Sequence, residues 1–160
     1  MIRQLTQAQA EQYIPHDTVR PHITAEYRTT NGREMWALYE DKYAVADEPS
    51  QDPLAIICVA YTNGVPTNEL ELEWFSTASG TGRVDTTTAV FYTVWSYSQG
   101  AGQAIVNSVA QRIHQTRPEI DRWVTLSPLT RMAERFHTKN GATLIARGDT
   151  CQNFEYSITS

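Results

Sequence analysis

Ser127 is one of two residues whose type and position suggest a reactive site. It closes a predicted strand, residues 122–127 (RWVTLS), and is followed by Pro128. Ligands of open α/β sheets collect at the carboxyl ends of the strands, so its hydroxyl is placed to contact a substrate. The alternative is that Ser127 caps the helix that follows, which a serine before a proline also fits. Position alone favours the cap.

His137 is the second candidate, because an imidazole can give or take a proton near neutral pH. It lies on a predicted helix, next to Phe136. A lone histidine at such a place is more often a half-exposed polar residue than a catalytic one. No carboxylate is clearly placed to orient it, so a Ser-His-carboxylate hydrolase is poorly supported. No metal site is predicted either, because His16, His22 and His114 lack the spacing of metal ligands.

A glycine turn, residues 99–102 (QGAG), joins a predicted strand to a predicted helix. Backbone N–H groups at a helix N-terminus have no partner within the helix and favour an anion, so a phosphate would fit there. The turn is not a P-loop, because no Gly-Lys-Ser/Thr follows, and it lacks the second half of a dinucleotide-binding glycine pattern. The candidate phosphate-binding residues are Ser98, Gln99, Gly100, Ala101, Gly102 and Gln103.

Strands and helices alternate through the middle of the chain. A strand at residues 89–98 is followed by a helix at 103–117, a strand at 122–127 and a helix at 128–141. This alternation predicts parallel strand pairing with right-handed crossovers. We therefore predict an α/β fold in one domain, residues 1–160, with a mixed central sheet and flanking helices.

Apolar residues at helical spacing indicate which helix faces are buried. In the first helix these are Ile105, Val106, Val109 and Ile113, and in the second they are Met132, Ala133 and Phe136. The second helix is predicted to stop at Gly141, which can take the left-handed conformation that ends helices.

The other predicted elements are shorter or less certain. Segment 54–62 (LAIICVAYT) is almost continuously apolar, which is typical of a strand covered on both faces. Segment 69–75 (ELELEWF) alternates acidic and apolar residues, as an edge strand does, with a short helix as the alternative. The rest are a helix capped by Thr6 at 6–14, a strand at 34–41, loops at 46–53 and 76–88, and strands at 142–148 and 152–159 that form a hairpin.

The composition is that of an ordinary soluble domain. Hydrophobic residues make up 41% and charged residues 19% of 160 residues, with a formal net charge of −5. This charge argues against nucleic acid or an acidic membrane as the main partner. No signal peptide or membrane-spanning run is predicted, and Cys58 fits a buried free thiol. We expect a reduced, cytoplasmic protein, and the sequence leaves its oligomeric state open.

The order of these elements resembles the Gcn5-related N-acetyltransferase (GNAT) fold. In that family a strand splays from its neighbour, and the following glycine turn holds the pyrophosphate of coenzyme A. The family turn is Gln/Arg-x-x-Gly-x-Gly/Ala, and residues 97–102 (YSQGAG) keep both glycines but begin with Tyr97. The late family motif Phe-Tyr-x-x-x-Gly-Phe corresponds to residues 136–142 (FHTKNGA), where His137 replaces the tyrosine general acid.

That replacement points to one branch, because the chain also resembles the catalytic domain of malonyl-CoA decarboxylase. The similar segments are 56–68, 87–102, 116–128 and 135–144, which include LSP and FHTKNGA. The resemblance implies that Ser127 and His137 are the catalytic pair and that a coenzyme A thioester is the substrate, with no permanently bound cofactor. The family enzymes are much longer, with a helical N-terminal domain and an insertion between the two motifs.

Three functions are therefore carried forward. The first is decarboxylation of malonyl-CoA or a related acyl-CoA to acetyl-CoA and CO₂. The second is an acyl-CoA-dependent N-acyltransferase, in which His137 protonates the leaving thiolate and Glu69, Glu71 and Glu73 attract a cationic amine. The third is a non-catalytic module that binds coenzyme A or a partner protein.

Overall fold

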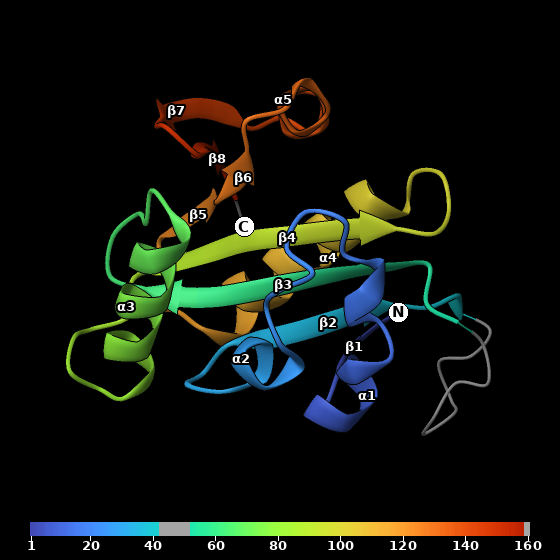
Figure 1. Ribbon diagram of the computed structural model, residues 1–160, viewed down its shortest axis with the longest axis horizontal. Coiled ribbons are helices and arrows are strands. Elements are labelled where there is room, and N and C mark those ends of the chain that lie inside the picture. The colour runs from blue at the N-terminus through green and yellow to red at the C-terminus, as the bar shows by residue number, and fades with distance from the viewer. Residues whose placement is uncertain (42–51, 159–160) are drawn as a thin grey trace.

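The computed structural model describes residues 1–41 and 52–158, and in these the strands form one mixed sheet with helices on both faces (Figure 1). The predicted loop at 46–53 lies mostly outside the described residues. The strands are β1 (Ile2–Gln4), β2 (Glu34–Leu38), β3 (Ala55–Thr62), β4 (Thr88–Ser96), β5 (Arg122–Thr125), β6 (Ser127–Pro128), β7 (Thr143–Arg147) and β8 (Cys151–Tyr156). The helices are α1 (Gln7–Glu11), α2 (Ala25–Thr29), α3 (Glu69–Gly80), α4 (Ala101–Thr116) and α5 (Arg131–Lys139), with a 3₁₀ turn at Ile14–His16.

The sheet runs in the order β1-β2-β3-β4-β5-β8-β6, with β7 added on β8. Neighbouring strands are antiparallel except for β4 and β5, which are parallel and joined by α4. The mixed α/β fold predicted from the sequence is therefore confirmed, and so is the parallel pairing around the glycine turn.

Strand β3 is the centre of the core, because every one of its residues is buried. The continuous apolar run that predicted this strand reflects cover on both faces. One face packs against α4, which buries Ile105, Val106, Val109 and Ile113 as its periodicity predicts. The other face packs against the segment that contains α1 and α2. Cys58 on β3 is a buried free thiol, and burial raises its pKa.

Segment 69–75 is a helix, and the predicted edge strand is wrong. The side chain of Asn68 accepts a hydrogen bond from the Glu71 amide and so starts α3. Leu72 is buried and Leu70 and Trp74 are exposed, which is the pattern of a helix with one buried face. The predicted loop at 76–88 is also too long, because its first five residues belong to α3.

Helix α5 begins later than predicted, and of its predicted buried residues Ala133 and Phe136 are partly buried. It starts at Arg131, and the Thr130 side chain accepts a hydrogen bond from the Ala133 amide. Ser127 is therefore not the helix cap. Met132 was predicted to be buried but is 79% exposed, and His137 is the buried residue of this helix. Gly141 has a φ of +97°, which confirms its predicted left-handed conformation.

The remaining predicted boundaries need small changes. Helix α4 starts at Ala101, so the second half of the predicted glycine turn is the first turn of the helix. The cap at Thr6 is confirmed, and the Gln9 side chain accepts a reciprocal bond from the Thr6 amide. The C-terminal strands form the predicted antiparallel hairpin, although the last predicted strand residue, 159, lies outside the described residues.

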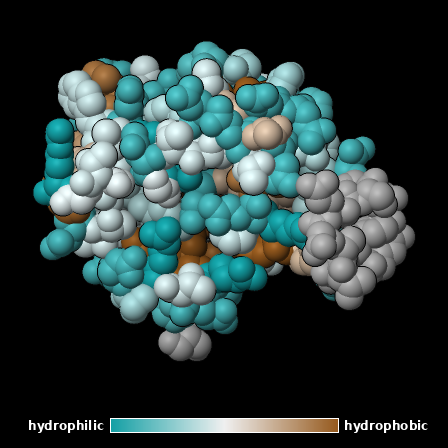
Figure 2. Space-filling view, turned by 90° about the horizontal axis from the view of Figure 1, so that it is seen from below, coloured by the Kyte–Doolittle hydropathy of each residue, from teal (hydrophilic) through white to brown (hydrophobic). Residues whose placement is uncertain are grey.

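One side of the molecule is mostly hydrophilic, with hydrophobic atoms visible in small areas between polar residues (Figure 2). Among the described residues, no helix is long and apolar enough to cross a membrane.

Candidate active site

Strands β4 and β5 separate halfway along β4. Residues 88–91 of β4 pair with residues 122–125 of β5, and the Leu126 amide makes a last bond to the Phe91 carbonyl at 3.1 Å. Beyond that point β4 pairs with β3 alone, whereas the chain after β5 turns into β6 and pairs with β8. The predicted opening between these two strands is therefore present.

A cavity of about 550 Å³ occupies this opening. It reaches from the first turn of α4, at Gly102, to the segment before α2, at Thr18 and Arg20. Its other walls come from β4 and α5 and from the end of β5. The lining residues used below are Thr93, Val94, Ser127, Phe136 and His137.

Arg20 bridges the two strands at the point where they separate. Its side chain is 3% exposed, and its guanidinium donates to the carbonyls of Tyr92 on β4 and Leu126 at the end of β5. Its Nε donates to Glu69 at 2.8 Å. These bonds satisfy carbonyls that lose their strand partners at the opening, so Arg20 fixes the width of the cavity at its base.

A β-bulge turns the backbone of β4 toward the opening. Thr93 pairs with Cys58 and Phe91 with Val59, which leaves Tyr92 as the extra residue. Further along, the Tyr97 amide donates to Leu54 on the β3 side. Because backbone groups alternate in direction along a strand, the N–H and C=O of Val94 point away from β3 and into the opening.

Ser127 is buried and lines the cavity. It belongs to β6, it is 3% exposed, and its Oγ lies 2.8 Å from Oγ1 of Thr125. The Thr125 hydroxyl also accepts the Phe154 amide at 3.0 Å. This network holds the serine hydroxyl in place at the carboxyl end of the strand.

His137 is also buried, at 7% exposed, which rules out the alternative of a half-exposed polar residue. Its ring stacks on Phe154, with centroids 5.3 Å apart, and its Nδ1 lies 2.7 Å from the hydroxyl of Tyr156. Burial lowers the pKa of His137 to about 4, because the charged imidazolium loses its hydration. The imidazole is therefore neutral at pH 7.

Ser127 and His137 line the same cavity, as expected of the pair that the resemblance to malonyl-CoA decarboxylase singles out. No hydrogen bond joins the two side chains in the described part of the chain: Ser127 bonds Thr125, and His137 bonds Tyr156. The arrangement therefore differs from a serine nucleophile activated by a histidine base.

The glycine turn lies at the end of the cavity beside α4. Gly100 is the N-cap residue, with a φ of +80°, and Gly102 is close enough to Phe136 that a Cβ would lie 3.1 Å from its ring. The Ala101 amide bonds the Ser98 carbonyl at 3.2 Å, whereas the amides of Gly102 and Gln103 have no acceptor within the helix. Of the predicted phosphate-binding residues, Ala101 and Gly102 are buried and Ser98, Gln99, Gly100 and Gln103 are exposed, with Gly102 lining the cavity.

The structure adds residues that the sequence did not reveal. Arg20, Thr93 and Tyr156 contribute to this region, and the buried Thr93 hydroxyl has no partner among the described residues. Arg20 carried no signal in the sequence because its partners are 72 and 106 positions away. Tyr156 carried a weak signal, since a tyrosine on an apolar strand needs a partner for its hydroxyl.

The acidic residues considered as an amine-attracting surface are partly engaged elsewhere. Glu69 bonds Arg20 and His22, and Glu71 accepts bonds from the amide and hydroxyl of Thr67. Within residues 1–41 and 52–158, no three His, Cys, Asp or Glu side chains are grouped as metal ligands.

Comparison with known proteins places this architecture. No protein-family model and no curated protein sequence matches the chain. Among solved structures, malonyl-CoA decarboxylase from Agrobacterium vitis aligns with a TM-score of 0.63 and 20% identity, over 85% of this chain and 35% of that one. The chain thus spans about a third of the length of that enzyme.

Two other similar structures match over almost their whole length. The GNAT-like decarboxylase GphF, in complex with isobutyryl-CoA, aligns with a TM-score of 0.64 and 13% identity, over 91% of this chain and 87% of that one. NAA60 from Arabidopsis thaliana, in complex with acetyl-CoA, aligns with a TM-score of 0.60 and 14% identity, over 99% of both chains. At these identities the likeness establishes the fold, and the chain has the GNAT fold.

Proposed function

We propose that this protein is an acyl-CoA decarboxylase of the malonyl-CoA type. The observation that carries the proposal is the joint burial of Ser127 and the neutral His137 around the cavity between β4 and β5. Structures with this fold include decarboxylases as well as a putative acetyltransferase. The replacement of a tyrosine by His137 in the late motif favours the decarboxylases.

The charge around the base of the cavity also favours an acidic acyl group. Arg20 and Arg28 are both buried, and the buried carboxylate of Asp17 forms an ion pair with Arg28 at 2.9 Å and accepts the backbone amide of Arg20. Glu69, which bonds Arg20, is 41% exposed and therefore screened by water. A buried region with more guanidinium than carboxylate groups favours an anion and disfavours a cationic amine.

Each step of the reaction has a residue to serve it. The pyrophosphate of coenzyme A would lie against the first turn of α4, which delivers the thioester into the opening. The Val94 N–H, which points into the opening, would stabilise the negative charge that develops on the thioester oxygen. Ser127 would hold the carboxylate out of the thioester plane, so that the breaking C–C bond overlaps the π system.

His137 would then protonate the α-carbon. As CO₂ leaves, the electron pair of the broken bond passes into the thioester enolate, and a proton from the imidazole converts that enolate into the acetyl thioester, while a replacement proton reaches the other ring nitrogen. A histidine that is neutral at pH 7 suits this role because it adds no positive charge to that of Arg20, which already borders the cavity.

The experiment measures malonyl-CoA turnover by the wild type and by Ser127→Ala and His137→Ala variants, with acetyl-CoA affinity measured in parallel. We expect His137→Ala to lower kcat by about 10²–10⁴-fold. Acetyl-CoA affinity should change little, since it comes mainly from the pyrophosphate turn. Ser108→Ala, an exposed serine on α4, is the matched control and should retain full turnover.

An N-acyltransferase is the second candidate, because the cavity extends to Thr18 and Val19, both exposed, where an acceptor can enter. In that case His137 protonates the leaving thiolate, and Ser127 has no carboxylate to hold. Wild-type protein that leaves malonyl-CoA intact but acylates an amine from acetyl-CoA would replace the decarboxylase assignment with this one. Binding of coenzyme A without either reaction would indicate the non-catalytic module.

A further inference from the structure

Tyr156 is the hydrogen-bond partner of His137 on the side away from the cavity. It ends β8, it is 6% exposed, and its hydroxyl lies 2.7 Å from Nδ1 of His137. The Nδ2 of Asn140, the residue that ends α5, lies 3.4 Å from the same hydroxyl oxygen. His137, Tyr156 and Asn140 thus form a chain of hydrogen bonds that leads away from the cavity.

The direction of this chain follows from the donors available. In the amide orientation assigned to Asn140, Nδ2 donates to the oxygen of Tyr156, and the buried Oδ1 has no partner among the described residues. The phenol has one hydrogen to donate, and Nδ1 of His137 is the acceptor that the described residues offer it, so we assign the hydrogen to that bond. A neutral imidazole that accepts at Nδ1 carries its proton on Nε2.

The Nε2 atom faces the cavity. His137 lines the cavity, and Nε2 has no hydrogen-bond partner among the described residues. Unlike the buried side-chain atoms that lack a partner, Nε2 keeps some surface that is accessible to solvent. The Nε2–H is therefore presented to whatever fills the cavity.

We propose that Tyr156 is a positioning residue that holds His137 as the Nε2–H tautomer and returns a proton to Nδ1 when Nε2 gives its own away. The tautomer assignment stands on the hydrogen bonds alone. The proton transfer to carbon rests on the proposed decarboxylase function.

The proton and electron balance of the step is complete. The C–C bond to the carboxylate breaks, CO₂ leaves, and the electron pair stays on the enolate. The α-carbon takes the Nε2 proton, Nδ1 takes the phenol proton, and Tyr156 becomes a phenolate. After the product leaves, the Nδ1 proton goes back to Tyr156, Nε2 takes a proton from water in the cavity, and the hydroxide that remains leaves to solvent.

The acid strengths of the groups involved permit this proton exchange. Burial raises the pKa of Tyr156 to about 12 and lowers that of His137 to about 4, so both groups are neutral between the two values. A phenol is a much stronger acid than the α-C–H of a thioester, so proton delivery to the enolate is downhill. The His137 ring stays neutral throughout, because it gains one proton as it loses another.

The test reads the tautomer directly. Two-bond ¹H–¹⁵N correlation spectra of the full chain distinguish Nδ1–H from Nε2–H imidazole, and a His137→Gln variant identifies the signal. We expect Nε2–H in the wild type. In Asn140→Asp the new carboxylate accepts the phenol hydrogen, so Nδ1 must donate and the Nδ1–H tautomer should appear. Asn107→Asp, an exposed position on α4, is the charge-matched control.

Kinetics test the second half of the proposal. Tyr156→Phe keeps the ring that packs against Phe91 but removes the hydroxyl. We expect kcat for malonyl-CoA to fall about 10- to 100-fold with KM within about twofold, because binding groups are untouched. A folded Tyr156→Phe variant with unchanged kcat would reject the relay.

The outcomes separate the two proposals. A wild-type Nδ1–H signal, or an unchanged tautomer in Asn140→Asp, overturns the role of Tyr156 whatever the substrate is. A wild-type Nε2–H signal that shifts in Asn140→Asp, in a protein that does not decarboxylate malonyl-CoA, supports the role of Tyr156 and rejects the decarboxylase.

Discussion

Arg20 donates from Nη2 to the carbonyl of Leu126 at 3.0 Å, across 106 positions of the chain. The same guanidinium binds the Tyr92 carbonyl on the other side of the opening. Where β4 and β5 separate, the buried Arg20 side chain therefore supplies hydrogen bonds to backbone carbonyls that a neighbouring strand supplies elsewhere in the sheet.

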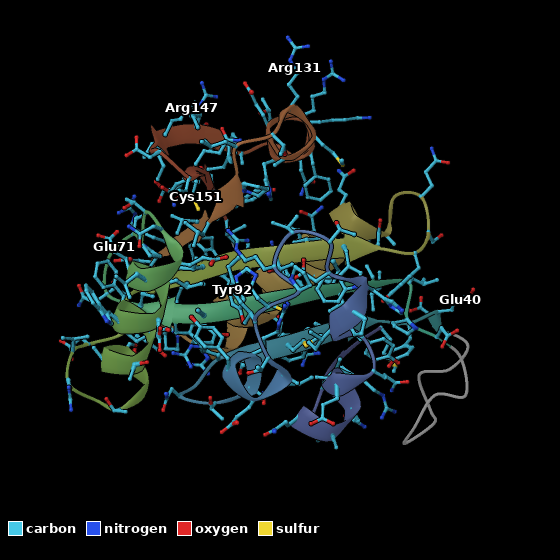
Figure 3. All side chains as sticks on the ribbon, in the orientation of Figure 1. Glu40, Glu71, Tyr92, Arg131, Arg147 and Cys151 are labelled. Carbon is cyan, nitrogen blue, oxygen red and sulfur yellow. The ribbon has the colours of Figure 1, made fainter. Side chains whose placement is uncertain are left out.

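Replacing Arg20 should therefore destabilise the fold. In Arg20→Met two buried carbonyls lose their donor, and we expect the free energy of unfolding to fall by about 3–5 kcal/mol. The measurement is urea denaturation at pH 7. Arg131→Met is the control, because Arg131 points outward from α5 (Figure 3), and its unfolding free energy should stay within about 0.5 kcal/mol of the wild type. Equal stability of the two variants would contradict the bridging role.

Gly100→Ala should weaken coenzyme A binding. Gly100 and Gly82 both have φ near +80° and both have open space where a Cβ would lie, so alanine costs similar backbone strain at either site, about 1–2 kcal/mol. Only at Gly100 does the new methyl group lie at the N-terminus of α4. By calorimetry we expect affinity to fall about tenfold in Gly100→Ala, as for one lost hydrogen bond to a phosphate, and to stay unchanged in Gly82→Ala. Equal affinities would remove the turn from the binding site.

The buried His137 makes stability depend on pH. Its folded pKa, about 4, lies below the unfolded value near 6.5, so the unfolded chain binds a proton first as the pH falls. Keeping His137 neutral therefore does not lower the free energy of unfolding above pH 6.5. Between pH 6.5 and about 4 the free energy of unfolding falls by about 3 kcal/mol, because only the unfolded chain is protonated there. Urea denaturation at pH 7 and pH 4.5 should show a smaller loss in His137→Gln than in the wild type. Identical losses would show that His137 is not held neutral.

Thr130, rather than Ser127, should carry the cap of α5. Thr130→Ala removes the acceptor for the Ala133 amide, so we expect a loss of about 1 kcal/mol in the free energy of unfolding. Thr130→Ser keeps a hydroxyl at the same place and should recover most of that loss. Thermal unfolding of both variants provides the measurement, and an alanine variant as stable as the wild type would speak against the cap.

Patterns of apolar residues within a short stretch of sequence correctly predicted the elements that are buried along one regular face or along their whole length. Helix α4 shows its buried face in the spacing of Ile105, Val109 and Ile113, and β3 shows its cover on both faces in one apolar run. The motif around His137 identified a residue that proved to be buried beside the cavity. These features depend on neighbours within a few residues or on burial itself, and both are visible in a sequence.

Other features depend on choices that local patterns do not settle. Residues 69–75 satisfy a strand and a helix equally, and the Asn68 cap decides between them. Met132 fits the apolar face of α5, but the cavity below this helix leaves it exposed. The bridge made by Arg20 joins three distant segments, so no short window of sequence could reveal it.

The parallel pairing between β4 and β5 is short. We therefore expect the C-terminal hairpin to be less protected from hydrogen exchange than the large sheet around β3. In the described residues, the strand pairing that joins the C-terminal hairpin and β5 to the rest of the sheet is limited to four residue pairs. The Arg20–Leu126 bond and a bond from the Asn153 side chain to the Pro66 carbonyl add to this connection, and Figure 1 shows β6, α5 and β7 standing off from the rest. Amide hydrogens in β7 and β8 should therefore exchange with deuterated solvent as one cooperative unit, faster than those of β3. A ligand that fills the cavity touches both parts, so its binding should slow exchange in the hairpin far more than in β3.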